Sequence, residues 1–138
     1  WLWDPDGGLL KVFGQLESHY AGAPEAMRAL AERHDLVVLT NRPRAVAHLT
    51  AAWLARWRIC FAELHVLGMG ALKSGVLPHA DVYVDDNPSV VRDLLENTDA
   101  RILVPGQPWN RDVEFGGGRV ERFVSWGTVE DRIECGDR

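Results

Sequence analysis

Residues 81–88 read DVYVDDNP, and the fold prediction starts from these eight residues. The apolar run from Val82 to Val84 is predicted to be a strand of a parallel sheet, as is the run at residues 36–39 earlier in the chain. Pro88 suits the first turn of a helix, and apolar residues follow it at helical spacing. Asp85 and Asp86 lie between the two elements, where adjacent carboxylates repel one another unless a cation neutralises them. The stretch therefore predicts a strand, an acidic turn that could bind a ligand, and a helix.

The same alternation of strand and helix patterns continues on both sides of this stretch. The predicted strands cover residues 1–3, 36–39, 61–67, 81–84 and 101–104, and the predicted helices cover residues 24–34, 44–57, 88–95 and 126–135. We expect Val46, Leu49, Trp53 and Trp57 to form a bulky core stripe on the second helix, and residues 105–120, rich in Gly and Pro, to form a loop.

This order predicts an α/β fold, with a three-layer, doubly wound parallel sheet and right-handed crossovers. Residues 1–138 are expected to form a single domain without an evident cap domain. In such sheets, ligands bind beyond the carboxyl ends of the strands. Each candidate residue below follows a predicted strand.

The composition limits the classes of partner. Of 138 residues, 46% are hydrophobic and 25% are charged, as in globular proteins, and no apolar segment is long enough to span a membrane. The net charge of −5 disfavours an extended nucleic acid, because such binding needs a basic surface. Cys60 and Cys135 fit reduced thiols, and residues 1–8 are unlike a secretory signal, so we expect a cytoplasmic location. The start at Trp1 is compatible with N-terminal trimming, and no feature fixes an oligomeric state.

Two aspartates follow the first predicted strand. Asp4 and Asp6 flank Pro5 in a turn that reads DPDGG. At a strand exit both could face a ligand, one as a nucleophile or metal ligand and the other as a general acid and base. The alternative is a simple acidic turn.

Further polar residues follow the later strands. Thr40 and Asn41 lie beside a predicted helix start, where a hydroxyl and free amides could cradle a phosphate, although Thr40 could instead be a helix N-cap. Lys73 could balance the charge of such a site, or it could be a solvated loop lysine. Asp85 and Asp86 could bind a metal or could cap the following helix. Oxygen ligands favour Mg²⁺ over zinc, since none of the five histidines lies at metal-ligand spacing with another His or Cys.

The ordered set of DxDG, Thr, Lys and DD resembles the four motifs of the haloacid dehalogenase superfamily, and the resemblance spans nearly the whole chain. It implies that Asp4 is the nucleophile that forms an aspartyl-phosphate. It also implies that Asp6 first protonates the leaving group and then activates water. The remaining implied roles are phosphate binding by Thr40, Asn41 and Lys73, and coordination of Mg²⁺ by Asp4, Asp6, Asp85 and Asp86.

Four further segments resemble the 5'(3')-deoxyribonucleotidase branch of that superfamily. They read YAGAPE at residues 20–25, LTNRP at 39–43, VDDNP at 84–88 and QPWN at 107–110. The resemblance implies a small phosphorylated substrate, such as a nucleoside monophosphate. The interval between Asp6 and Thr40 is too short for the helical cap of those nucleotidases, which predicts a capless enzyme.

A second hypothesis is a non-catalytic phosphate-binding or protein-interaction module with the same fold. It is favoured by Pro5, which lacks the backbone amide that a phosphate could accept at this position. A phosphoacceptor receiver domain is disfavoured, because there the acidic pair precedes the lysine, whereas Asp85 and Asp86 follow Lys73.

Overall fold

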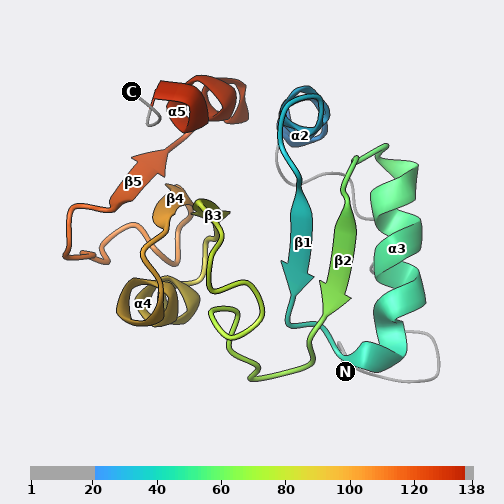
Figure 1. Cartoon of the computed structure of the whole chain (residues 1–138), viewed down its shortest axis with the longest axis horizontal. Helices are drawn as coiled ribbons and strands as arrows, with labels where there is room; N and C mark the ends of the chain where they lie inside the picture. The colour runs from blue at the N-terminus through green and yellow to red at the C-terminus, as the bar shows by residue number, and fades with distance from the viewer. Residues whose placement is uncertain (1–20, 136–138) are drawn as a thin grey trace. The chain divides into compact units, whose positions relative to one another are not determined.

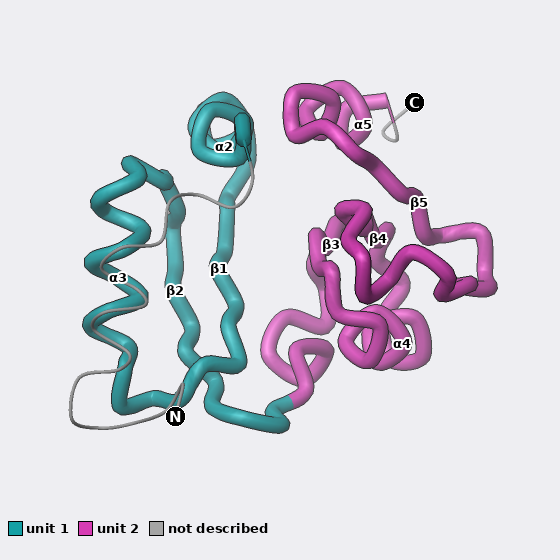
Figure 2. Tube along the Cα trace, turned by 180° about the vertical axis from the view of Figure 1, so that it is seen from behind, with its two compact units in different colours: residues 1–71 teal, residues 72–138 magenta. Residues whose placement is uncertain are grey.

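The structure is a computed structural model that describes residues 21–135. Two compact units divide the chain, unit 1 at Trp1–Ala71 and unit 2 at Leu72–Arg138 (Figure 2). The predicted strand at residues 1–3, with Asp4 and Asp6 behind it, lies outside the described residues. Within residues 21–135, no helix combines the length and the apolar character needed to cross a membrane.

Unit 1 contains a pair of parallel strands and their connecting helix. Its elements are α2 (Ala23–Ala31), β1 (Val37–Thr40), the 3₁₀ helix η1 (Arg44–Val46), α3 (Ala47–Arg56) and β2 (Glu63–Val66). Val37 lies opposite Glu63 and Thr40 lies opposite Val66, so both strands end at the same edge. In Figure 1, α3 runs alongside β2.

The start of α2 depends on a glycine. Gly22 precedes the helix with a φ of 85°, a conformation that residues with a Cβ rarely adopt. Its carbonyl accepts the first helical hydrogen bond, from the amide of Ala26 at 3.0 Å. Pro24 then occupies the first turn, where its missing N–H costs nothing.

The buried face of α3 differs from the predicted stripe. Val46 is buried as predicted, but the next fully buried residues are Thr50 and Leu54, while Leu49, Trp53 and Trp57 are only half-buried. Burial of Thr50 costs little because its hydroxyl donates to the Val46 carbonyl at 3.3 Å and accepts from Arg42 at 3.3 Å. The spacing of apolar residues in the sequence had instead predicted that the larger rings of Trp53 and Trp57 would be in the core.

Unit 2 contains parallel strands in the order β3, β4, β5. Its elements are β3 (Val82–Val84), α4 (Pro88–Asn97), β4 (Arg101–Pro105), β5 (Val120–Phe123), the 3₁₀ helix η2 (Trp126–Thr128) and α5 (Val129–Cys135). Figures 1 and 2 show α4 and α5 on opposite sides of these strands. The centre of the unit is fully buried and consists of Val91, Leu94, Ile102, Leu103, Val104 and Val129.

Both ends of α4 are closed by side chains. Asn87 is the N-cap, and its side chain accepts from the amide of Ser89 at 2.9 Å. At the other end, the guanidinium of Arg119 donates to three backbone carbonyls, which belong to Leu95, Thr98 and Ala100 at 2.7, 2.8 and 2.9 Å. Both groups satisfy backbone positions that a helix leaves without internal partners.

The predicted parallel α/β fold is confirmed, with the described strands paired in two open sheets. The predicted loop at residues 105–120 is wrong at its end, because β5 begins at Val120. This strand reads VERF and buries only Phe123 fully, so it lacks the continuous apolar run of a central strand. The glycines at residues 116–118 further obscured its start.

Tyr83 provides a test of this core. Its hydroxyl donates to the Leu77 carbonyl at 2.5 Å, and burial, aided by the charge of Asp93, raises its pKa above 10.0. We expect Tyr83→Phe to cost about 1 kcal/mol at neutral pH, because one buried hydrogen bond is lost. Above pH 10 the unfolded tyrosine ionises before the folded one, so the advantage of the parent should shrink as the pH rises.

Urea unfolding of the parent and Tyr83→Phe, on both sides of about pH 10, measures this difference. A constant difference in unfolding free energy across that range would contradict the raised pKa.

Candidate functional site

The exit of β3 carries a buried carboxylate. The amide of Asp85 donates to the Leu103 carbonyl at 3.2 Å, which extends the pairing with β4 by one residue. Its carboxylate accepts from the Lys73 ammonium at 2.6 Å and from the Asn87 amide at 2.9 Å. Asn87, rather than either aspartate, is the N-cap of α4, and the Asp85 carboxylate supports the backbone amide of that N-cap residue. Asp86 follows in the same turn and is half-buried.

Lys73 forms a buried ion pair with Asp85. The side chains of Lys73 and Asp85 are only 15% and 7% exposed, so the alternative of a solvated loop lysine is wrong. Removing both charges from water is costly, and a close contact recovers part of that cost. The structure thus brings two of the predicted site residues of unit 2 together.

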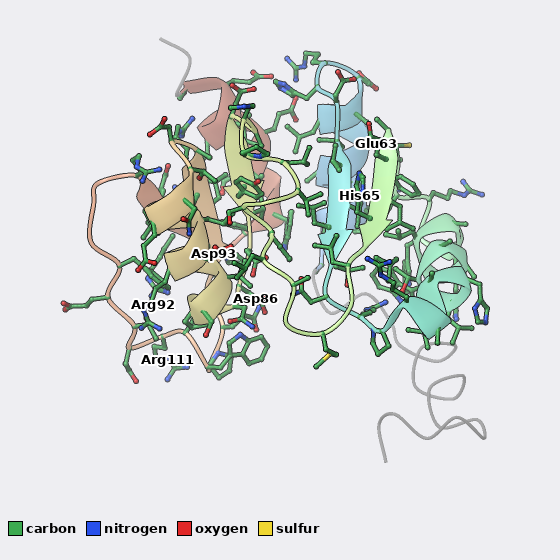
Figure 3. The ribbon with its side chains drawn as sticks, turned by 60° about the horizontal axis from the view of Figure 1, so that its bottom comes forward. Glu63, His65, Asp86, Arg92, Asp93 and Arg111 are labelled. Atoms are coloured by element: carbon green, nitrogen blue, oxygen red, sulfur yellow. The ribbon has the colours of Figure 1, made fainter. Side chains whose placement is uncertain are left out.

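The loop that carries Lys73 is fixed by α4. Asp93, which lies on this helix, accepts from the Ser74 hydroxyl at 2.8 Å and from the Ser74 amide at 3.3 Å (Figure 3). Asn97 donates to the same carboxylate at 3.1 Å and thereby holds it in place. The backbone next to Lys73 is therefore tied to the helix that follows the acidic turn.

Asn110 ties a second loop to the acidic turn. This side chain is fully buried, and its amide nitrogen donates to the Asp86 carbonyl at 2.9 Å and the Pro105 carbonyl at 3.0 Å. Its oxygen accepts from the Gln107 amide at 3.0 Å and from Arg122 at 3.1 Å. Sequence reasoning gave Asn110 and Asp93 no role. The QPWN segment was the available signal for Asn110.

Thr40 and Asn41 lie in unit 1, at the exit of β1. The Thr40 hydroxyl accepts from the Arg42 amide at 3.4 Å, and η1 has Pro43 as its N-cap residue, so Thr40 is not a helix N-cap. Asn41 donates to the Ala71 carbonyl at 2.6 Å, whereas its buried side-chain oxygen has no hydrogen-bond partner. Burial lowers the pKa of Arg42. The side-chain oxygen of Asn41 is thus a buried acceptor without a donor in this turn.

Only two of the four predicted magnesium ligands, Asp85 and Asp86, belong to the residues that the structure describes. Among residues 21–135, no three His, Cys, Asp or Glu side chains gather as a metal centre would require. Asp4 and Asp6, which belong to the predicted ligand set, lie outside that range. Convergence of all the predicted residues on one ion therefore stays a prediction.

Comparisons with known proteins give one informative similarity. No family model matches the chain. The chain is 33% identical, over 112 residues, to an Oceanobacillus iheyensis protein named "Putative nucleotidase". The similarity covers 78% of this chain and 57% of that protein, so the chain spans little more than half the length of this relative.

The ion pair can be tested by its coupling energy. We expect Lys73→Met or Asp85→Asn alone to lower the unfolding free energy by about 3–5 kcal/mol, because each leaves a buried polar or charged group without its partner. The double variant should lose much less than the sum of the two. Urea unfolding of all four proteins completes the cycle.

Glu25→Gln is the matched control, since it breaks the exposed pair of Glu25 with Arg28 at 3.0 Å. It should change the unfolding free energy by no more than about 1 kcal/mol. Additive losses from Lys73→Met and Asp85→Asn would show that the pair contributes no coupling.

Proposed function

We propose that this chain is a Mg²⁺-dependent phosphomonoester hydrolase that acts on nucleoside monophosphates. The observation that carries the proposal is the buried pair of Lys73 and Asp85, with Asp86 in the same turn, at the carboxyl end of a parallel strand. Ligands of parallel α/β folds bind at such ends. The order of the sequence motifs and the similarity to a protein named as a nucleotidase support the same reaction class.

Lys73 suits the binding of a phosphoryl group. A lysine ammonium is a compact point charge, and proteins use it in this way to bind phosphate. Asp85 fixes the position of that charge before the substrate arrives, and the Asp93 contact with Ser74 holds the backbone beside it. Such preorganisation lowers the cost of arranging charges during the reaction.

Magnesium prefers hard oxygen ligands such as carboxylates and carbonyls. In line with the family resemblance, we assign direct coordination to Asp86 and an indirect role to Asp85, whose two oxygens accept hydrogen bonds from Lys73 and Asn87. Asp4, through its carboxylate, and Asp6, through its carbonyl, would complete the protein ligands. When bound, Mg²⁺ would neutralise part of the negative charge shared by the phosphate and the carboxylates.

The residues of the chain then divide the reaction into two displacements. The Asp4 carboxylate attacks phosphorus, the bond to the leaving oxygen breaks, and Asp6 gives that oxygen a proton. Asp6 next takes a proton from water, whose oxygen attacks the aspartyl-phosphate and releases phosphate, which restores Asp4. Thr40, Asn41 and Lys73 bind the phosphoryl oxygens throughout.

The second candidate is a phosphate-binding or protein-interaction module without catalysis. Pro5 favours it, because a proline offers no amide to a phosphoryl oxygen beside the proposed nucleophile. The two candidates share the phosphate site but differ in turnover.

Turnover is tested by phosphate release from a panel of phosphomonoesters with and without Mg²⁺. We expect release in the parent, none in Asp4→Asn, and a rate in Asp6→Asn that is lower by roughly 10²- to 10⁴-fold, the usual effect of a positioned acid and base. Circular dichroism should show that both variants keep the fold. Full activity in Asp4→Asn would place the nucleophile elsewhere, and an inactive parent would favour the non-catalytic module.

The metal assignment is tested by thermal unfolding. Mg²⁺ that binds only the folded chain should raise the melting temperature, with a stabilisation of about 2.7 kcal/mol at 100 times Kd. Asp86→Asn should abolish the shift. Asp81→Asn, which removes an exposed carboxylate just before β3, should keep it. Equal shifts in the two variants would contradict coordination by Asp86.

A further inference from the structure

Trp109 is an exposed ring on the loop that follows β4. Trp109 is 59% exposed, whereas Phe61, the other exposed aromatic residue in the described part of the chain, is 36% exposed. An exposed indole offers a flat apolar face on which a planar ligand can stack. The surroundings of Trp109 show which kind of ligand could reach this face.

The backbone beside Trp109 is anchored by its neighbour. Asn110, the next residue, is fully buried and makes the four side-chain hydrogen bonds described above. Arg122, on β5, also donates to the carbonyl of Asn110 at 2.8 Å and to that of Val113, and its guanidinium lies 5.3 Å from the centre of the Phe115 ring. The backbone that carries the indole therefore needs no ordering when a ligand stacks on the ring.

The same anchor places Trp109 beside the candidate site. Asn110 donates to the carbonyl of Asp86 at 2.9 Å, so Trp109 is one residue from a direct contact with the acidic turn. β3 and β4 are parallel, and both the turn and the loop leave the same edge of their sheet. Asp86 is marked in Figure 3 together with Arg111, an exposed cation that follows Asn110.

The chemistry of the occupant follows from this arrangement. The ligand should carry an anionic group that can contact Lys73 and the metal. It should also carry a flat aromatic group, a short distance away, that can stack on Trp109. A nucleoside monophosphate has this form, because one sugar separates its phosphate from its base. Stacking on an indole accepts any base, since every base offers a π-face.

We infer that Trp109 is the base-stacking residue of this site and that it selects nucleoside monophosphates over phosphomonoesters that lack a ring. This inference rests on the proposed function and adds the determinant of its specificity. It assigns to a side chain of the β4 loop the contact that a separate cap could otherwise supply.

The test compares two substrates that differ only by the base, a nucleoside 5'-monophosphate and ribose 5-phosphate. We expect Trp109→Ala to lower the ratio of their kcat/KM values by about 5- to 150-fold, mainly through KM of the nucleotide, as when one stacked base loses its partner. Trp109→Phe, which keeps a ring, should restore most of the ratio. Phe61→Ala removes an exposed ring that precedes β2 and should leave the ratio as in the parent.

A ratio that Trp109→Ala leaves unchanged would overturn the inference while the phosphatase proposal stands. If the parent hydrolyses neither ester, the phosphatase proposal fails, and calorimetric titration of the parent and Trp109→Ala with the same two compounds decides the inference. Preferential nucleotide binding that is lost in Trp109→Ala would then support it. Equal binding of both compounds to the two proteins would overturn it.

Discussion

The hydrogen bonds of β4 to its two neighbours are the constraint on which unit 2 depends. Val82 lies opposite Arg101 on one side and Ile102 lies opposite Val120 on the other, with all strands parallel. This pairing sends the acidic turn and the QPWN loop out at one edge. Ile102, Leu103 and Val104 are fully buried, so a shift in register would expose apolar side chains as well as separate the polar groups.

Polar groups buried at that edge depend on one another. Lys73 donates to Asp85, Asp93 accepts from Ser74, and Asn110 donates to the carbonyl of Asp86. Each would be costly without its partner, and each is satisfied only when segments distant in sequence have docked. The same contacts that satisfy these groups also fix the Lys73 charge and the backbone beside Trp109, where we propose that a phosphate and its substituent bind.

Continuous apolar runs such as LVVL and VYV predicted the strands, although β1 is only half-buried and Val84 of β3 is exposed. Local patterns also pointed to Lys73, Asp85 and Asp86. They failed for β5, whose Glu121 and Arg122 interrupt the run, and for Thr50, whose burial relies on a bond from Arg42.

Asn110 and Asp93 had no assigned role because their partners lie 24 and 19 residues away, beyond any local spacing. The roles proposed for Asp4 and Asp6 rest on the sequence alone.

Arg119 has a consequence for the order in which unit 2 assembles. Its guanidinium closes the carboxyl end of α4 from 24, 21 and 19 residues farther along the chain. Thr98 closes the last turn locally through the Leu94 carbonyl, whereas the carbonyls of Leu95 and Thr98 gain Arg119 as a partner only when the segment before β5 arrives. We therefore expect the carboxyl end of α4 to become fully stable together with β5, as one cooperative unit, although the helix itself could nucleate much earlier.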